Sequence, residues 1–271
     1  MRRSSSRTRA VGIGCLLVAC CGTEQLANTL PDAAPDVRIR DSGRDVIVAD
    51  SSDAASPPLV CDPPPPDTIF CTQFEEDGGN PGVGWTFTRV DYGTVTFDTS
   101  SFVSPVRSYR ATAKLHDSGF PIAAAILIYT IPNGSSYKTI SLRVMMRVHQ
   151  MSERVNLIQL GYPTGKNTQD FAVIATDGAN LYLTAMVSDI PSTDNVTNID
   201  RDVWTELRLD LSPPPAAPNV SMYVNGVLVD SVAPAFNPPS TPERDAVVGV
   251  EASGKAEDIV EYDDFLLRGL N

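Results

Sequence analysis

The sequence predicts an all-β protein, built from two packed antiparallel sheets and preceded by an unfolded N-terminal segment. From Phe70 onward, short β-branched or aromatic stretches alternate with Gly, Pro, Asn and Asp turn residues. No helix is predicted between these stretches, which favours a two-layer sandwich over a mixed α/β fold. All nine Phe, eight Tyr and two Trp residues lie at or beyond Phe70 in the 271-residue chain. The core-forming part of the chain is therefore expected to begin near that residue.

At least ten strands are expected in the C-terminal part. The longest alternates from Ile140 to His149, so that apolar side chains face one way and Ser141, Arg143, Met145, Arg147 and His149 the other. Asp177-Gly178 and Asn225-Gly226 are typical of tight hairpin turns. The segment 255–270 also fits an amphipathic helix, which is an alternative to a strand there. The expected strands are 94–97, 140–149, 155–162, 171–176, 180–187, 205–211, 220–224, 227–229, 246–250 and 259–267.

The first 19 residues have the pattern of a secretory signal. Four arginines precede the ten-residue apolar stretch 10–19, which is too short to span a bilayer. The stretch ends in Leu17-Val18-Ala19-Cys20, which resembles the lipobox of bacterial lipoproteins. This resemblance implies cleavage before Cys20, lipidation of that cysteine and attachment to a membrane. Because no Asp follows Cys20, we expect the outer membrane or the cell surface. An ordinary cleaved signal with a chance cysteine is the alternative.

Residues 20–67 are expected to form a disordered tether rich in Pro, Asp and Ala, followed by one folded domain over 68–271. The tether has no aromatic side chain and cannot bury enough apolar surface to offset its ordering entropy. Its expected role is to hold the folded domain away from the membrane. Cys61 and Cys71 are candidates for a disulfide in an exported protein, with two free thiols as the alternative.

The charge of the chain narrows its partners. The formal net charge is −12, which argues against nucleic acid because a phosphate-binding surface needs clustered Lys and Arg. Such an acidic body is repelled by anionic headgroups, so membrane contact is expected through the N-terminal lipid alone. No cofactor or metal is expected. The one cation considered is calcium, because acidic and amide residues gather in segments that look like loops: Asp189, Asp194, Asn195, Asn198, Asp200 and Asp202.

The C-terminal strands resemble a known fold family. The order Trp204–Leu211, Val220–Gly226, Val248–Val250 and Glu261–Leu267 is similar to the second half of concanavalin A-like lectin/glucanase domains, above all the laminin-G-like ones. The resemblance implies a jelly-roll sandwich whose concave sheet often holds a saccharide. It supports the fold better than any activity, because one fold hosts many functions.

The candidate ligand-binding residues are Arg143, Met145, Arg147 and His149 on the longest strand, together with Trp85 in a glycine-flanked segment. The cationic groups could pair with uronate or sulfate oxygens, and an exposed Trp85 ring could stack on a sugar. The alternative is that the strand residues are ordinary solvated side chains on the wet face of a sandwich. The expected partners are a polysaccharide or an envelope protein.

Catalysis is not expected, although one pair of carboxyl groups is an alternative catalytic site. Glu261 and Asp263 are same-face neighbours, as the carboxyl pair of a retaining glycosidase requires. They lack the third carboxylate of the Glu-x-Asp-x-Glu strand that the resemblance would imply. The sequence therefore predicts a non-enzymatic module, with a glycoside hydrolase or lyase on the same fold as the alternative.

Overall fold

A computed structural model describes residues 61–75, 81–114, 123–152, 154–161, 170–187, 190–212, 218–236, 243–252 and 256–271. The predicted signal segment, Cys20 and residues 20–60 of the predicted tether lie outside the described residues. None of the helices in the described part has the length and apolar character needed to cross a bilayer. The domain limits 1–19, 20–67 and 68–271 remain predictions.

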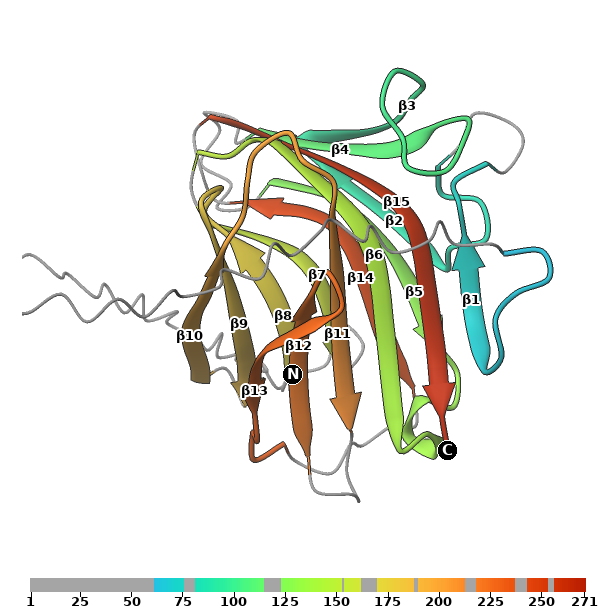
Figure 1. The fold of residues 1–271 in the computed structure, drawn as a ribbon, viewed down its shortest axis with the longest axis vertical. Coiled ribbons are helices and arrows are strands. Elements are labelled where there is room, and N and C mark those ends of the chain that lie inside the picture. The colour runs from blue at the N-terminus through green and yellow to red at the C-terminus, as the bar shows by residue number, and fades with distance from the viewer. Residues whose placement is uncertain are drawn as a thin grey trace, which may run out of the picture. The chain divides into compact units, whose positions relative to one another are not determined.

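The first sheet, here called sheet A, contains eight antiparallel strands (Figure 1). Strand β1 pairs with β15 alongside the main path of the sheet. The order along that path is β13 (Val227–Val232), β12 (Asn219–Val224), β11 (Thr205–Ser212), β6 (Thr139–Gln150), β15 (Glu257–Leu270), β4 (Ser108–Lys114) and β3 (Gly93–Asp98), with β1 at Thr68–Thr72.

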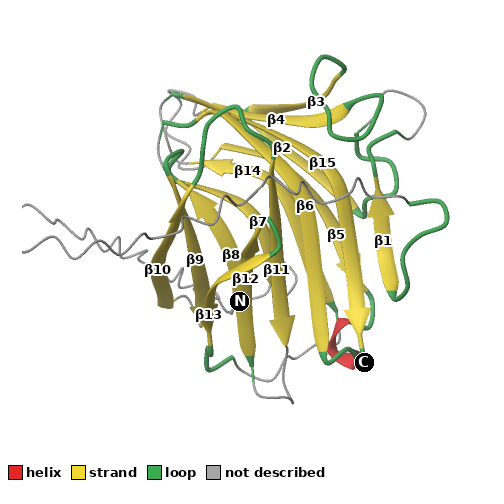
Figure 2. Cartoon of the chain, viewed as in Figure 1, coloured by secondary structure: helices red, strands yellow, loops and turns green. Residues whose placement is uncertain are grey.

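The second sheet, sheet B, contains seven antiparallel strands, and Figure 2 shows that strands dominate the described part of the chain. The described residues contain one short 3₁₀ helix, Gly134–Ser136, and no α-helix. The two-sheet antiparallel sandwich predicted from the sequence is confirmed. The order in sheet B is β10 (Ile190–Asn198), β9 (Asn180–Val187), β8 (Phe171–Thr176), β7 (Val155–Gly161), β14 (Arg244–Ala252), β5 (Ala123–Ile131) and β2 (Phe87–Asp91).

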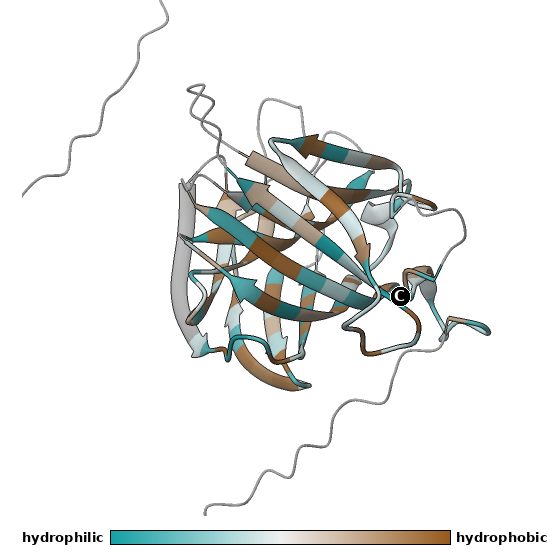
Figure 3. Ribbon diagram, turned by 90° about the horizontal axis from the view of Figure 1, so that it is seen from above, coloured by the Kyte–Doolittle hydropathy of each residue, from teal (hydrophilic) through white to brown (hydrophobic). Residues whose placement is uncertain are grey.

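The main core lies between the sheets and is filled by every second residue of the strands. Figure 3 shows hydrophobic and hydrophilic residues alternating along many of them. Strand β6 follows the predicted alternation, and its inward face consists of Ile140, Leu142, Val144, Met146 and Val148, all buried in the core. This packing leaves the alternate side chains of β6 on the outer face of sheet A.

The structure corrects the expectation for Trp85. Its side chain is only 8% exposed and packs in the core, with its ring centroid 4.7 Å from that of Phe265 and 5.1 Å from that of Phe70. The flanking glycines suggested an exposed loop. The loop instead folds inward, because the large apolar ring gains more from burial than from contact with water.

All ten expected strands occur, with ends shifted by a few residues, and the helical alternative for 255–270 is wrong because Glu257–Leu270 forms β15. Five strands were not predicted: β1, β2, β4, β5 and β10. The loop assignment of Asp194, Asn195 and Asn198 is wrong, since they belong to β10, which pairs with β9 along its whole length. This strand is polar and contains Pro191, features tolerated at a sheet edge.

The hairpin turns and the cysteine pair lie where the pattern placed them. Gly178 and Gly226 have φ values of +86° and +76°, and Asn225 also has a positive φ, as tight hairpins require. Cys61 and Cys71 are joined by a disulfide whose Cα atoms are 5.7 Å apart. This bond ties Cys61 to β1, which contains Cys71.

Candidate functional site

The predicted cationic residues of β6 lie on the outer face of sheet A, and each charged one has a partner within the protein. Arg143 Nε lies 2.6 Å from Glu206 Oε2, and the two residues belong to the adjacent strands β6 and β11. Arg147 donates to the Asp202 carbonyl oxygen at 3.0 Å and to the Ser101 hydroxyl. Because both guanidinium groups already have partners within the protein, these contacts favour a satisfied polar face over a ready-made anion site.

His149 and Met145 complete that strand face. His149 Nδ1 lies 2.6 Å from Asp202 Oδ1, so the ring is held against a half-exposed carboxylate. Met145 is 8% exposed and outside the main core, which leaves little of it for a ligand to contact. The structure thus brings together all four β6 candidates on one face, but Trp85 lies in the core, away from them.

Glu261 lies at the centre of a buried ionic cluster on the same face. Its side chain is 1% exposed and contacts Arg110 Nη1 at 3.2 Å, Arg147 Nη1 at 3.9 Å and His149 Nε2 at 2.8 Å. The last contact is close but lacks the alignment of a regular hydrogen bond. A carboxylate held this way balances neighbouring positive charges and is not open to a substrate.

Asp263 and Asp264 anchor a neighbouring loop. Asp263 Oδ2 accepts hydrogen bonds from the Val103 and Ser104 backbone N–H groups at 2.7 and 2.9 Å, and Asp264 Oδ1 accepts one from the Ser104 hydroxyl. Burial raises the pKa of Asp263 to about 7, even though these donors act to lower it. Asp263 is fully buried, so the alternative catalytic pair of Glu261 and Asp263 is enclosed by protein.

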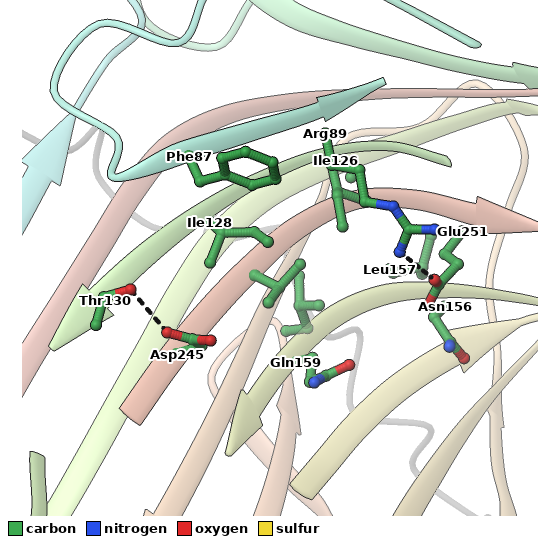
Figure 4. A pocket seen from close by; sticks show the side chains of 13 residues that line it. Phe87, Arg89, Ile126, Ile128, Thr130, Asn156, Leu157, Gln159, Asp245 and Glu251 are labelled. Atoms are coloured by element: carbon green, nitrogen blue, oxygen red, sulfur yellow. Dashed lines mark hydrogen bonds and ion pairs between the residues drawn. The ribbon is translucent and has the colours of Figure 1, made fainter. Parts of the chain in front are cut away.

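An open pocket lies on the outer face of sheet B, where it crosses β2, β5, β14 and β7 (Figure 4). Its volume is about 320 Å³. Ile126, Ile128 and Val247 form its apolar floor as a small cluster separate from the main core. Phe87, from the edge strand β2, stands beside this floor and is 57% exposed.

A glycine shapes the floor of the pocket. Gly249 lies opposite Ile126 in the β14–β5 pairing and has a φ of +138°, in a conformation that side chains rarely adopt. A Cβ at this position would meet the Ala125 carbonyl oxygen at 2.2 Å. The β14–β7 register also shifts between Val248 and Glu251, so the strand pairing is irregular beside this glycine.

The rim of the pocket is polar. Arg89 Nε contacts Asp91 Oδ2 at 2.5 Å, and its Nη1 contacts Glu251 Oε1 at 3.4 Å. The Thr130 hydroxyl donates to Asp245 Oδ1 at 2.9 Å. On the β7 side lie the amides Asn156 and Gln159, which Figure 4 shows beside the apolar floor.

Sequence reasoning missed this pocket altogether. One signal was available in β5, whose apolar run Ala123-Ala124-Ala125-Ile126-Leu127-Ile128 places bulky apolar side chains on both faces of the sheet. A strand with one wet face normally alternates, so this run indicates a covered or ligand-binding outer face. The strand pairing that unites it with Phe87 and Gln159 could not be read from the pattern.

No group of three or more His, Cys, Asp or Glu side chains suited to holding a metal ion occurs among the residues that the structure describes. Asp200 and Asp202 lie in the segment after β10, where both are exposed. Asp189 lies outside the described residues, and the side chains of Asp194 and Asn195 are also outside them. The calcium hypothesis thus stays a prediction from sequence.

Comparison with known proteins shows the fold alone. Neither a family model nor a curated protein sequence matches the chain. Among solved structures, an endo-β-1,4-glucuronan lyase from the fungus Trichoderma reesei aligns with a TM-score of 0.57 and 12% identity, over 75% of this chain and 96% of that one. The cellulose-induced protein Cip1 aligns with a TM-score of 0.51 and 16% identity, over 73% and 96%.

A third similar structure is the binding domain of botulinum neurotoxin DC in complex with SialylT. Its TM-score is 0.51 at 14% identity, and the alignment covers 76% of this chain but only 48% of that one. These neighbours share the two-sheet β-sandwich fold of the described part, and at 12–16% identity they show nothing beyond the fold.

Proposed function

We propose that this protein is a non-enzymatic, lipid-anchored envelope protein that binds a saccharide in the sheet B pocket. The observation that carries the proposal is the pocket itself, an open hollow with an apolar floor, one exposed aromatic ring and a rim of amide and carboxylate groups. Sites of this composition combine apolar contact area with a few polar groups that fix orientation.

The chemistry of a sugar ring suits this arrangement. A pyranose has an apolar face of C–H groups that can lie on an aromatic ring, and hydroxyl groups at its edge that donate and accept hydrogen bonds. Phe87 offers such a ring on the edge strand, while Asn156 and Gln159 offer amide donors and acceptors across the floor. One ligand could contact both sides at once.

The names of the fold neighbours point to the same class of ligand. One is a glucuronan lyase and one a cellulose-induced protein, and a third was solved in complex with SialylT. Identity of 12–16% transfers no activity, so these names support only the choice of saccharide as the first ligand class to test.

Binding without turnover is the favoured form of the proposal. The described residues that line the pocket include no His or Tyr to move a proton. Its two carboxylates are engaged, Glu251 with Arg89 and Asp245 with Thr130. The enclosed Glu261 on the other sheet has no route to this pocket's ligand.

The test is a glycan array with the purified full chain, combined with a reducing-end assay on every glycan that binds. Phe87→Ala should weaken binding at least about tenfold, because the ring supplies the largest exposed contact. Leu228→Ala is the matched control, since Leu228 is 53% exposed on β13 of the other sheet. Binding unaffected by Phe87→Ala, or release of reducing ends, would contradict the proposal.

The anchor is tested separately in a bacterial host by labelling with a clickable palmitate. The wild-type chain should incorporate the label, and Cys20→Ala should not, because the acyl groups attach at that residue. Cys21→Ala is the matched control and should still be labelled. Incorporation into Cys20→Ala would refute the lipoprotein assignment.

A further inference from the structure

The charges of the sheet B pocket leave no cation free to receive an anionic sugar. Its lining holds one guanidinium, Arg89, against two carboxylates, Asp245 and Glu251. Arg89 is already bound on two sides, by Asp91 Oδ2 at 2.5 Å and by Glu251 Oε1 at 3.4 Å. A uronate or sulfate group would have to displace one of these carboxylates and then lie close to it.

The unengaged polar groups of the pocket are neutral. Asn156 and Gln159 lie on β7, opposite Glu251 and Val247 of β14. Among the residues that the structure describes, neither of their side-chain amides has a hydrogen-bond partner. An amide offers two donors and one acceptor oxygen, which matches the hydroxyl groups of an uncharged sugar. The groups available to a ligand are therefore amides and not ions.

The pocket is also long enough for more than one sugar residue. Phe87 on β2 and Gln159 on β7 are separated by β5 and β14, three inter-strand steps that span about 14 Å. A chain laid across the strands would contact the Phe87 ring at one end, the floor of Ile126 and Val247 in the middle, and the amides at the other end.

We infer, resting on the proposed function, that the pocket selects neutral oligosaccharides and rejects polymers of uronic acids or sulfated sugars. The overall net charge of −12 acts in the same direction, since it repels polyanions at long range. The arginines of β6 had suggested an anionic saccharide as the ligand. They lie on the other sheet and are paired there, so they do not contribute to this pocket.

The test uses matched probes that differ only at C6, which carries a neutral hydroxymethyl group in one member and a carboxylate in the other. Oligosaccharides of β-1,4-glucan, β-1,4-mannan and α-1,4-glucan are each compared with the same oligosaccharide oxidised to a carboxylate at C6, by calorimetry with the full chain at low salt. The neutral member of each pair that binds should bind at least about tenfold more tightly, and added salt should narrow the difference.

Glu251→Gln should reduce the preference for the neutral member several-fold, because it removes a repelling carboxylate and frees one side of Arg89. Asp67→Asn is the matched control, since it changes the net charge equally at an exposed pair with Arg268 on sheet A. It should leave the preference unchanged. An equal effect of both variants would overturn the assignment to this pocket.

The outcomes separate the two proposals. Preference for the oxidised members, lost in Phe87→Ala, would overturn the inference of a neutral ligand and leave saccharide binding in place. Absence of binding to every probe and to the glycan array would overturn both. Preference for the neutral members, lost in Phe87→Ala, supports both.

Discussion

The hydroxyl of Tyr262 donates a hydrogen bond of 2.7 Å to the carbonyl oxygen of Gly249, across the core that separates the two sheets. Tyr262 lies on β15 of sheet A, whereas Gly249 lies on β14 beneath the pocket of sheet B. The same hydroxyl lies 3.3 Å from the Leu157 carbonyl oxygen of β7. Beside the register shift between β14 and β7, a core tyrosine thus donates to a backbone carbonyl of each of these strands.

Tyr262→Phe should destabilise the protein by about 1–3 kcal/mol, because it removes the hydroxyl donor that two buried carbonyl oxygens share. Chemical denaturation measures the change. Tyr109→Phe is the comparison, since its hydroxyl reaches a single carbonyl, that of Ala125 at 3.2 Å, and the loss there should be smaller. Equal losses in the two variants would argue against a special role for the Gly249 contact.

Gly249→Ala should cost several kcal/mol of folding free energy, because the new Cβ would meet backbone at 2.2 Å as well as adopt an unfavourable φ. Gly226→Ala separates these effects. Gly226 also has a positive φ, but nothing lies within 4 Å of its Cβ position. Its replacement should cost only about 1 kcal/mol. Similar denaturation midpoints for the two variants would contradict the argument.

Glu261→Gln should destabilise the protein by about 1–3 kcal/mol, because it removes the buried carboxylate that Arg110, Arg147 and His149 share. Arg110 keeps its contact with Asp98 and His149 its contact with Asp202, which limits the loss. The exposed pair of Asp67 and Arg268 provides the control, and Asp67→Asn should cost at most about 1 kcal/mol. The measurement is urea unfolding at neutral pH. A stable Glu261→Gln protein would show that the cluster is not a structural element.

Asp263 should make stability fall as the pH rises from about 4 to about 7. Its pKa is raised from 3.8 to about 7 by burial, so over this range the folded protein holds a proton that the unfolded chain has released. The measurement is the unfolding free energy of the wild type and of Asp263→Asn at several pH values in this range. The advantage of the wild type over Asp263→Asn should shrink as the pH rises.

Asp177 provides a control of opposite sign. Burial raises its pKa, but hydrogen bonds from the Tyr182 hydroxyl and the Ala179 and Asn180 N–H groups outweigh that effect and hold the pKa well below its usual range. The stability advantage of the wild type over Asp177→Asn should be present above pH 3.8 and lost as the pH falls below it. If the stability difference from the wild type did not change with pH in either variant, the pKa shifts assigned to Asp263 and Asp177 would be wrong.

Replacing Cys61 and Cys71 together by Ser should destabilise the protein by about 2–3 kcal/mol in the chain-entropy model, because the bond closes a loop between residues ten apart. Thermal unfolding with and without reductant measures the effect. Reductant should lower the midpoint of the wild type and leave the double variant unchanged. A midpoint that does not respond to reductant in either protein would show that the bond contributes nothing to stability.

The local sequence pattern predicted a strand correctly where one face of that strand is exposed to water. The alternation from Ile140 to Val148 predicted the buried face of β6, and Asn225-Gly226 predicted the β12–β13 hairpin. It failed where a strand departs from that pattern. Strand β5 is apolar on both faces, and β10 is polar with a proline, so neither shows a period of two.

The sequence by itself determined the fold class, the positions of ten strands along the chain and which side chains of β6 share a face. These features follow from the alternation of residues two apart. Only the tertiary structure decided which charges meet. Glu261 gathers Arg110, Arg147 and His149, and Phe87 and Gln159 come to lie across one floor, through pairings between strands distant in sequence. Strand register sets such encounters, and no local pattern encodes it.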